Sequence, residues 1–391
     1  MPRLIDRFNS AYRGLSPPTP TPCSASQLEE YLAKYEFSAP YLLCCSDAES
    51  FSMHEIIGYA SDSEKELWNN LRLGYTEAFG LPVLRTEIAN SLYPKLKTDN
   101  ILCFAGAEDG IFCALHTLCE QGDHVIVLTP CYQSLIEIPK LSGAEITSVP
   151  LLAKNKWCID LDEIKKAIKA NTKCIVINFP HNPTGQVITQ SELKELVAIC
   201  DAHGLWLFSD EVYRLLGNPK EGFAQPAAEI YPRARSLGVM SKSFGMPGLR
   251  IGWIACQDKQ LLKKIEYMKH YTSICNSAPS EIISLIALRN KDKILSRNNL
   301  IVAENLKLLD VFIERYKDLF EWVRPQGGCI GFVRYKGQES IESFSKRLMK
   351  EKGVLLMPAS VYDHESKCFR IGFGRKNMPQ ALGKLEEFLK L

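Results

Sequence analysis

Short apolar runs rich in β-branched residues alternate with helix-length stretches across residues 101–255. Strands are predicted at residues 101–104, 125–128, 146–150, 174–178, 205–208, 237–240 and 251–255, and helices at 108–119, 134–141, 161–170 and 192–203. Strands that alternate with helices of this length form parallel sheets whose two faces are both covered. The sequence therefore predicts an α/β fold with a mostly parallel central sheet and helices on both faces.

The segments on either side predict a smaller α+β domain. A proline-rich segment at residues 16–22 should lie extended as an arm, because proline cannot continue a helix. Further helices are predicted at residues 27–35, twice within 64–92, at 280–316 with a break near 290–293, at 343–350 and at 380–389, and strands at 41–45, 327–333, 354–357 and 369–373. We expect an N-terminal arm and part of the small domain at residues 1–60, a large domain at 61–285 and a small C-terminal domain at 286–391.

Composition narrows the functional classes. The net charge of +2 gives no reason to expect nucleic acid or an anionic membrane as a partner. No apolar run approaches the ~20 residues that span a bilayer, and no signal peptide is evident. The 14 cysteines lack the Cys-x-x-Cys spacing of a metal site, and many lie in apolar runs. We therefore expect a reduced, cytoplasmic protein without a metal, in preference to a disulfide framework.

One lysine lies in a turn rich in hydroxyl groups and glycine. Ser241 and Lys242 are followed by a Gly-Met-Pro-Gly turn and then by Arg250. A lysine in such a turn can form a Schiff base with an aldehyde, while the serine and the arginine bind a phosphate. The alternative is a surface loop with ordinary charges.

Four other stretches are predicted to join this turn at the carboxyl ends of the predicted strands, where open parallel sheets bind ligands. Gly106 and Ala107 start a helix, so their backbone N–H groups can approach an anion, or they form a plain tight turn. Asn182 can donate a side-chain hydrogen bond. Asp210 ends an apolar strand and can pair with a pyridinium N–H, or it caps a helix. Arg370, inside a strand of the small domain, requires a carboxylate partner.

In this order, the stretches resemble the class I/II aminotransferases, which are fold type I enzymes that use pyridoxal 5′-phosphate (PLP). The resemblance extends from about residue 74 to the C-terminus. It implies that Lys242 bonds to the cofactor aldehyde and later carries the substrate Cα proton, and that Asp210 pairs with the pyridine nitrogen. It implies that Tyr213 and Asn182 bind the 3′-oxygen of the ring, and that Lys242, Asp210 and Tyr213 form the catalytic set.

The same resemblance assigns the remaining groups. The phosphate would be bound by Ser241, Arg250, Gly106 and Ala107, the ring would stack on Tyr132, and Arg370 with Asn182 would bind the substrate α-carboxylate end. Tyr75 matches the tyrosine that reaches the phosphate of the other subunit. The resemblance therefore implies a homodimer with active sites shared between subunits.

The loop at residues 45–55 departs from the family pattern. Ordinary members carry a Gly-x-Pro-type loop here, whereas this chain has neither residue and instead carries Asp47 and Glu49. The loop is similar to that of the branch containing capreomycidine synthase, which cyclises a hydroxylated arginine. Two carboxylates facing the distal end of the substrate could bind a guanidinium, so we predict an arginine-like substrate. The alternative is that both side chains face solvent.

Three functions are compatible with these residues. The first is PLP-dependent elimination and cyclisation of an arginine-like amino acid, which the loop favours. The second is ordinary transamination with a 2-oxo acid, which needs only the shared site. The third is a non-catalytic regulator, which the lack of a basic helix-turn-helix pattern before Tyr75 disfavours.

Overall fold

A computed structural model of the chain describes residues 26–364 and 366–390. Its centre is a seven-stranded sheet with the strand order β2-β8-β7-β6-β5-β3-β4. The strands are β2 (Ile101–Phe104), β3 (His124–Thr129), β4 (Glu145–Pro150), β5 (Thr172–Asn178), β6 (Trp206–Asp210), β7 (Ala234–Val239) and β8 (Gly252–Cys256). Only β8 runs against its neighbours. The predicted, mostly parallel sheet is therefore confirmed.

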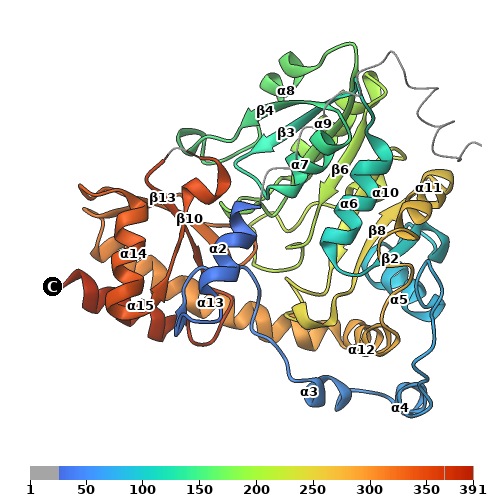
Figure 1. Cartoon of the computed structure of the whole chain (residues 1–391), viewed down its shortest axis with the longest axis horizontal. Helices are drawn as coiled ribbons and strands as arrows, with labels where there is room; N and C mark the ends of the chain where they lie inside the picture. The colour runs from blue at the N-terminus through green and yellow to red at the C-terminus, as the bar shows by residue number, and fades with distance from the viewer. Residues whose placement is uncertain (1–25, 365, 391) are drawn as a thin grey trace, which may run out of the picture.

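Helices cover both faces of this sheet (Figure 1). On one face lie α6 (Ala107–Leu118), α7 (Ser134–Leu141) and α11 (Lys259–Lys269), and on the other lie α5 (Pro82–Leu92), α8 (Leu161–Ala167), α9 (Gln190–Ala202) and α12 (Ala278–Arg289). Val125 and Val127 of β3 pack into the first layer, whereas Ile126 and Leu128 pack into the second. Alternate side chains of a strand point to opposite faces, so a continuous apolar run fills both layers.

The smaller part of the molecule lies at one end of the sheet, where α14 (Ile341–Lys352) and α15 (Met378–Leu389) are grouped (Figure 1). Its antiparallel sheet has the order β12-β13-β10-β9, with β9 (Phe320–Trp322), β10 (Ile330–Tyr335), β12 (Met357–Pro358) and β13 (Cys368–Gly372). A separate parallel pair joins β1 (Tyr41–Leu42) to β11 (Val354–Leu355). The 25-residue helix α13 (Lys291–Arg315) follows α12 after the break at Asn290.

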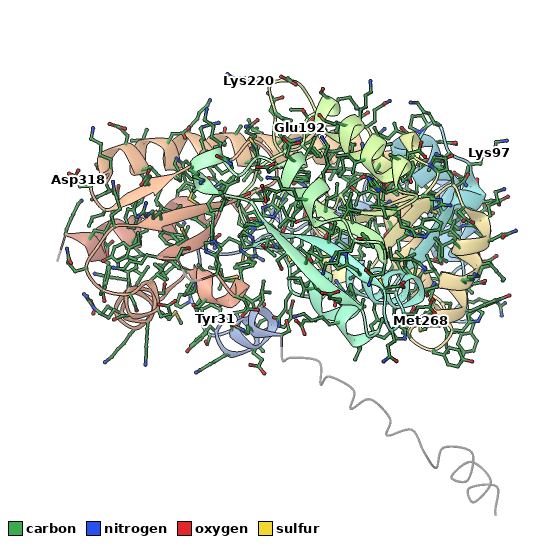
Figure 2. The ribbon with its side chains drawn as sticks, turned by 90° about the horizontal axis from the view of Figure 1, so that it is seen from above. Tyr31, Lys97, Glu192, Lys220, Met268 and Asp318 are labelled. Carbon is green, nitrogen blue, oxygen red and sulfur yellow. The ribbon has the colours of Figure 1, made fainter. Side chains whose placement is uncertain are left out.

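The N-terminal helix α2 (Gln27–Tyr35) packs against this smaller part, beside the 3-10 turn η4 (Ala359–Tyr362), as Figure 2 shows. The Tyr31 hydroxyl donates a hydrogen bond of 2.6 Å to the carbonyl of Leu356. Residues from the two ends of the chain therefore pack together. The predicted proline-rich arm falls within residues 1–25, outside the described residues.

The structure corrects one expectation and adds elements that the sequence analysis does not predict. Residues 43–45 are not a strand, because their backbone carbonyls bond to β13 irregularly: Leu43 accepts from Gly372 N and Cys44 from Arg370 Nε. Helix α11 was not predicted, although its Asp258 cap and its apolar residues at helical spacing signal it. The short strand β9 was not predicted either.

The described helices and cysteines bear on the expected location of the protein. None of the helices described is long and apolar enough to cross a membrane. The cysteines that the structure describes are all free, and all but Cys158 and Cys275 are buried.

Candidate active site

Lys242 lies in the loop after β7, and its amine is held by the N-terminal segment of the chain. Lys242 Nζ donates a 2.9 Å hydrogen bond to Ser46 Oγ, and it lies 5.9 Å from the centre of the Tyr213 ring. Burial lowers the pKa of this amine, against the opposing effect of the Asp47 carboxylate. A lowered pKa raises the fraction of neutral amine, which is the form that acts as a nucleophile or a base.

Asp210 is the last residue of β6 and is buried. Burial raises the pKa of its carboxyl to about 7, while the 3.1 Å hydrogen bond from Val212 N and the charge of Lys242 act in the opposite direction. A turn follows β6, not a helix, so the helix-cap interpretation of Asp210 is wrong. Such a carboxyl is suited to bind a positively charged ring N–H, because a positive partner stabilises the carboxylate that burial alone disfavours.

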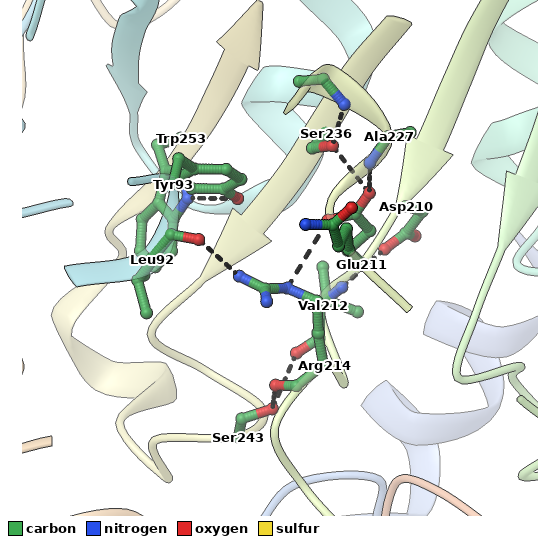
Figure 3. Close-up of polar contacts among 12 residues, drawn as sticks. Leu92, Tyr93, Asp210, Glu211, Val212, Arg214, Ala227, Ser236, Ser243 and Trp253 are labelled. Carbon is green, nitrogen blue, oxygen red and sulfur yellow. Dashed lines mark hydrogen bonds and ion pairs between the residues drawn. The ribbon is translucent and has the colours of Figure 1, made fainter. Parts of the chain in front are cut away.

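The side chain of Tyr213 points into the same region. Within residues 26–364 and 366–390 its buried hydroxyl has no partner at hydrogen-bond distance. Ser243 fixes the position of this tyrosine, since its hydroxyl donates to the carbonyls of Val212 and Arg214 on either side of it, at 3.2 and 2.8 Å (Figure 3). The serine next to Lys242 thus locks the lysine loop to the tyrosine turn.

Glu211 and Arg214 brace this turn from behind (Figure 3). The buried Glu211 carboxylate accepts hydrogen bonds from Ser236 Oγ at 2.7 Å and from Ala227 N at 2.9 Å. Arg214 lies 3.7 Å from the same carboxylate and donates to the carbonyl of Leu92. These contacts tie the turn that carries Tyr213 to Ser236, Ala227 and Leu92 and so restrict its movement, although Glu211 Oε2 has only the ion pair with Arg214 and no hydrogen bond among the described residues.

Gly106, Ala107 and Arg250 form a cradle at the start of α6. Gly106 has φ +93°, and a Cβ there would lie 2.9 Å from Arg250 Cζ. Gly252 lets β8 approach the backbone of Gly106 closely, since a Cβ at position 252 would lie 2.8 Å from the Gly106 carbonyl carbon. A guanidinium and the N-terminus of a 12-residue helix therefore meet, with the buried Ser241 on the same loop as Arg250. Such a cradle is suited to a phosphate.

Asn182 and Arg370 are joined by a tyrosine that the sequence did not point to. Asn182 Oδ1 accepts hydrogen bonds from the Tyr362 hydroxyl at 3.0 Å and from Arg370 Nη1 at 3.2 Å, and all three residues are buried. Arg370 also donates to the Tyr362 hydroxyl. With its oxygen engaged in this way, Asn182 retains its amide N–H₂ as a donor for a ligand. Tyr362 lies in η4, after a two-residue strand, where no periodicity could identify it.

The two other aromatic candidates differ in their surroundings. Tyr132 is partly buried, and its hydroxyl donates a 3.1 Å hydrogen bond to Glu29 of α2. Tyr75 is 90% exposed and lines a surface hollow together with Leu73, Asn276, Ser277 and their neighbours. Its predicted role concerns a second subunit and stays a prediction.

Asp47 and Glu49 are both engaged within the chain. The buried Asp47 carboxylate accepts two hydrogen bonds from Arg375 Nη2, at 3.0 and 2.9 Å, and Glu49 accepts one from Lys376 N at 2.8 Å. The expectation that Asp47 faces solvent is therefore wrong. Its role toward a substrate guanidinium would require exchange with Arg375, which lies three residues after the end of β13 at Gly372.

The site fits PLP on three independent observations. The raised pKa of Asp210 suits the ring nitrogen, the unpartnered Tyr213 hydroxyl suits the 3′-oxygen, and the cradle that a Cβ at Gly106 would fill suits the phosphate. Lys242 lies on the same edge of the sheet. These residues would therefore hold the cofactor.

Comparison with known proteins decides the family. The family model for aminotransferase class I and II matches residues 44–385. The chain belongs to this family. As an aminotransferase-family protein it is a PLP-dependent enzyme, as its relatives also indicate.

Three relatives illustrate the range of this family. Capreomycidine synthase from Streptomyces vinaceus is 26% identical over 95% of both chains. An aspartate aminotransferase from Sulfurisphaera tokodaii is 29% identical over 81% of this chain and 83% of its own. The crystal structure of a PLP-dependent aminotransferase from Streptococcus suis superposes with a TM-score of 0.89 at 31% identity, covering 94% of this chain and 98% of that one.

The cradle makes a prediction about cofactor affinity. Gly106→Ala should weaken PLP binding at least about tenfold, because the new methyl group occupies the space of the Arg250 guanidinium at a φ that disfavours alanine. Titration of the apoenzyme with PLP, followed by absorbance, measures the change. Gly248→Ala is the matched control, since nothing lies within 4 Å of a Cβ there. Equal affinities for the two variants would contradict the assignment of the cradle.

The pKa of Asp210 makes a prediction about the apoenzyme. Between its ordinary value of 3.8 and about 7, the folded protein keeps a proton that the unfolded chain releases, so stability falls as pH rises through this range. Asp210→Asn removes this loss and should become more stable than the parent by about 2–4 kcal/mol at pH 8, with little difference at pH 4. Urea unfolding at both pH values measures it. The exposed Asp292→Asn serves as control, and a pH-independent difference for Asp210→Asn would refute the assignment.

Proposed function

We propose that Lys242 is the lysine that bonds to PLP and that Asp210, Tyr213 and Asn182 bind its ring. When bound, the cofactor supplies an aldehyde for the amine and an electron sink for the substrate Cα. The observation that supports this most directly is that an amine whose pKa is lowered by burial and a carboxyl whose pKa is raised by burial lie at the same edge of the sheet. Lys242 then takes the proton from Cα, and Asp210 keeps the ring nitrogen protonated.

We propose that Arg370 binds the α-carboxylate of an amino acid. Its guanidinium is buried and oriented by Tyr362 and by the Cys44 carbonyl, so it presents a fixed fork to a planar carboxylate. Asn182 Oδ1 accepts hydrogen bonds from the Tyr362 hydroxyl and from Arg370 Nη1. If the amide N–H₂ of Asn182 binds the cofactor ring, the same side chain aligns the substrate carboxylate with the cofactor. This arrangement serves any reaction that begins with removal of the Cα proton.

For the reaction itself, we propose elimination and cyclisation of a hydroxylated, arginine-like amino acid. Support comes from capreomycidine synthase, which matches 95% of both chains, and from the two carboxylates of the loop at residues 45–55. Asp47 already binds one guanidinium, that of Arg375, through both carboxylate oxygens. The same geometry would accept the guanidinium of a substrate in exchange, with Glu49 two residues away.

Transamination with a 2-oxo acid is the second candidate. A specific observation favours it: Arg375 neutralises Asp47, which weakens the attraction of the loop for a cationic substrate. The 31% identity to a solved PLP-dependent aminotransferase supports it as well. Both reactions use the same proposed residues, since fold and cofactor do not fix the outcome.

We further propose that the enzyme is a homodimer. Leu73, Tyr75 and Tyr271 each expose more than four-fifths of their surface, which is unusual for large apolar side chains and typical of a surface covered by a partner. Tyr75 would then reach the cradle of the other subunit. A cytoplasmic location stays a prediction that the free cysteines favour.

Product analysis separates the two reactions. The holoenzyme is incubated with hydroxylated arginines, arginine, aspartate and alanine, each with and without 2-oxoglutarate, and the products are identified by mass spectrometry. Cyclisation predicts a product that has lost one molecule of water from a hydroxylated arginine, with no 2-oxo acid and no pyridoxamine phosphate. Formation of pyridoxamine phosphate and a 2-oxo acid from aspartate or alanine instead would show a transaminase and contradict cyclisation.

The Asp47 carboxylate is tested in the same assay. If it binds a substrate guanidinium, Asp47→Asn should raise KM for the arginine-like substrate about tenfold or more and leave KM for alanine unchanged. Glu49→Gln provides the matched comparison. A similar change for both substrates would mean that Asp47 only supports the loop through Arg375.

A further inference from the structure

Ser46 is held in place by a network around its loop. Ala48 N donates to the Lys242 carbonyl at 3.4 Å, and Glu49 N donates to the Gly374 carbonyl at 2.8 Å. Arg297 Nη1 donates to the Glu49 carbonyl at 3.1 Å. The loop is therefore bonded both to the lysine turn and to Gly374, just after β13. These bonds fix the backbone that carries the Ser46 hydroxyl.

Ser46 Oγ lies at hydrogen-bond distance from Lys242 Nζ, at 2.9 Å. An ammonium can only donate in this bond, whereas a neutral amine can donate an N–H and keep its lone pair free to take a proton. The same oxygen can then accept from the ammonium that results. A hydrogen bond to a charged donor is stronger than one to a neutral donor. Ser46 therefore favours the protonated amine while it orients the neutral one.

The Ser46 hydroxyl also lies near the buried hydroxyl of Tyr213, although the two do not meet in hydrogen-bond geometry. Burial raises the pKa of Tyr213, and both the Arg370 charge and the Ser46 hydroxyl lower it. The hydroxyl at position 46 therefore contacts the lysine amine and also lies near the tyrosine.

We propose that Ser46 is a positioning residue for Lys242, holding the amine beside Tyr213 whenever the amine is not bonded to cofactor. During turnover this is the period in which Lys242 takes the Cα proton, so Ser46 fixes the base at the moment of transfer and then solvates the ammonium. The inference rests on the proposed role of Lys242 and holds for transamination and cyclisation alike. The charged and titratable groups that influence the amine are Asp47, Arg370, Cys45, Cys329 and Asp210.

The first test needs neither cofactor nor substrate. The full-length apoenzyme is labelled with acetic anhydride at neutral pH, and acetylation of the Lys242 peptide is followed by mass spectrometry, with the exposed Lys220 as internal reference. Ser46→Ala removes the acceptor that favours the ammonium, so Lys242 should label up to about tenfold faster. Ser46→Thr keeps the hydroxyl and should label at the parent rate, as Lys220 should in every variant.

The second test measures the rate of Cα hydrogen exchange, which should fall in the variant whose labelling rate rises. The holoenzyme is placed in D₂O with L-alanine or L-arginine, and exchange of the Cα hydrogen is followed by mass spectrometry. Ser46→Ala and Ser46→Gly should exchange about tenfold more slowly, because the base is no longer held, whereas Ser46→Thr should retain most of the rate. Loss of structure would also expose the buried amine and slow exchange, so each variant must first show the parent's urea unfolding midpoint and the parent's PLP affinity before the two rates are compared.

Two results would overturn the inference. One is parent-rate labelling of Lys242 in Ser46→Ala, and the other is a Ser46→Thr variant that behaves like Ser46→Ala in both assays. If the parent itself exchanges neither amino acid, the proposed function fails for these substrates, and the labelling experiment still decides the role of Ser46.

Discussion

Burial of a carboxyl group and an amine at one edge of the sheet is the constraint on which the site depends. Asp210 ends β6 in the apolar interior, where its pKa rises to about 7, and Lys242 lies on the loop after the neighbouring β7, where burial lowers the pKa of its amine. Without a ligand, burial disfavours the charged form of each group. A cofactor with a ring N–H would stabilise the Asp210 carboxylate, and its aldehyde would bond to the neutral Lys242 amine.

Close backbone approach sets the other end of the site. β8 runs against β2 and β7, and Gly252 at its start lets the strand contact Gly106, so that the guanidinium of Arg250 lies against the first turn of α6. A side chain at Gly106 would fill the cradle, and one at Gly252 would push the strands apart. The two glycines thus determine how near an anion can come to the helix N-terminus.

Much of this architecture is predictable from the sequence, because it follows from local patterns. The alternation of β-branched runs with helices predicts the sheet, and strand ends predict where Asp210 and Asn182 lie. Contacts made by irregular backbone are not predictable in this way. Ser46 meets Lys242 across 196 residues, and Arg375 pairs with Asp47 across 328, both from loops without periodicity. The sequence therefore predicts a substrate as the partner of Asp47, whereas the structure pairs it with Arg375.

Borohydride trapping tests most directly whether the Lys242 amine bonds to PLP. Purified holoenzyme is reduced, digested and mapped by mass spectrometry. We expect the phosphopyridoxyl group on the peptide containing Lys242, and we expect Lys242→Ala to take up none while remaining folded. Stable attachment at a different lysine, or a protein that takes up no label when supplied with the cofactor, would contradict it.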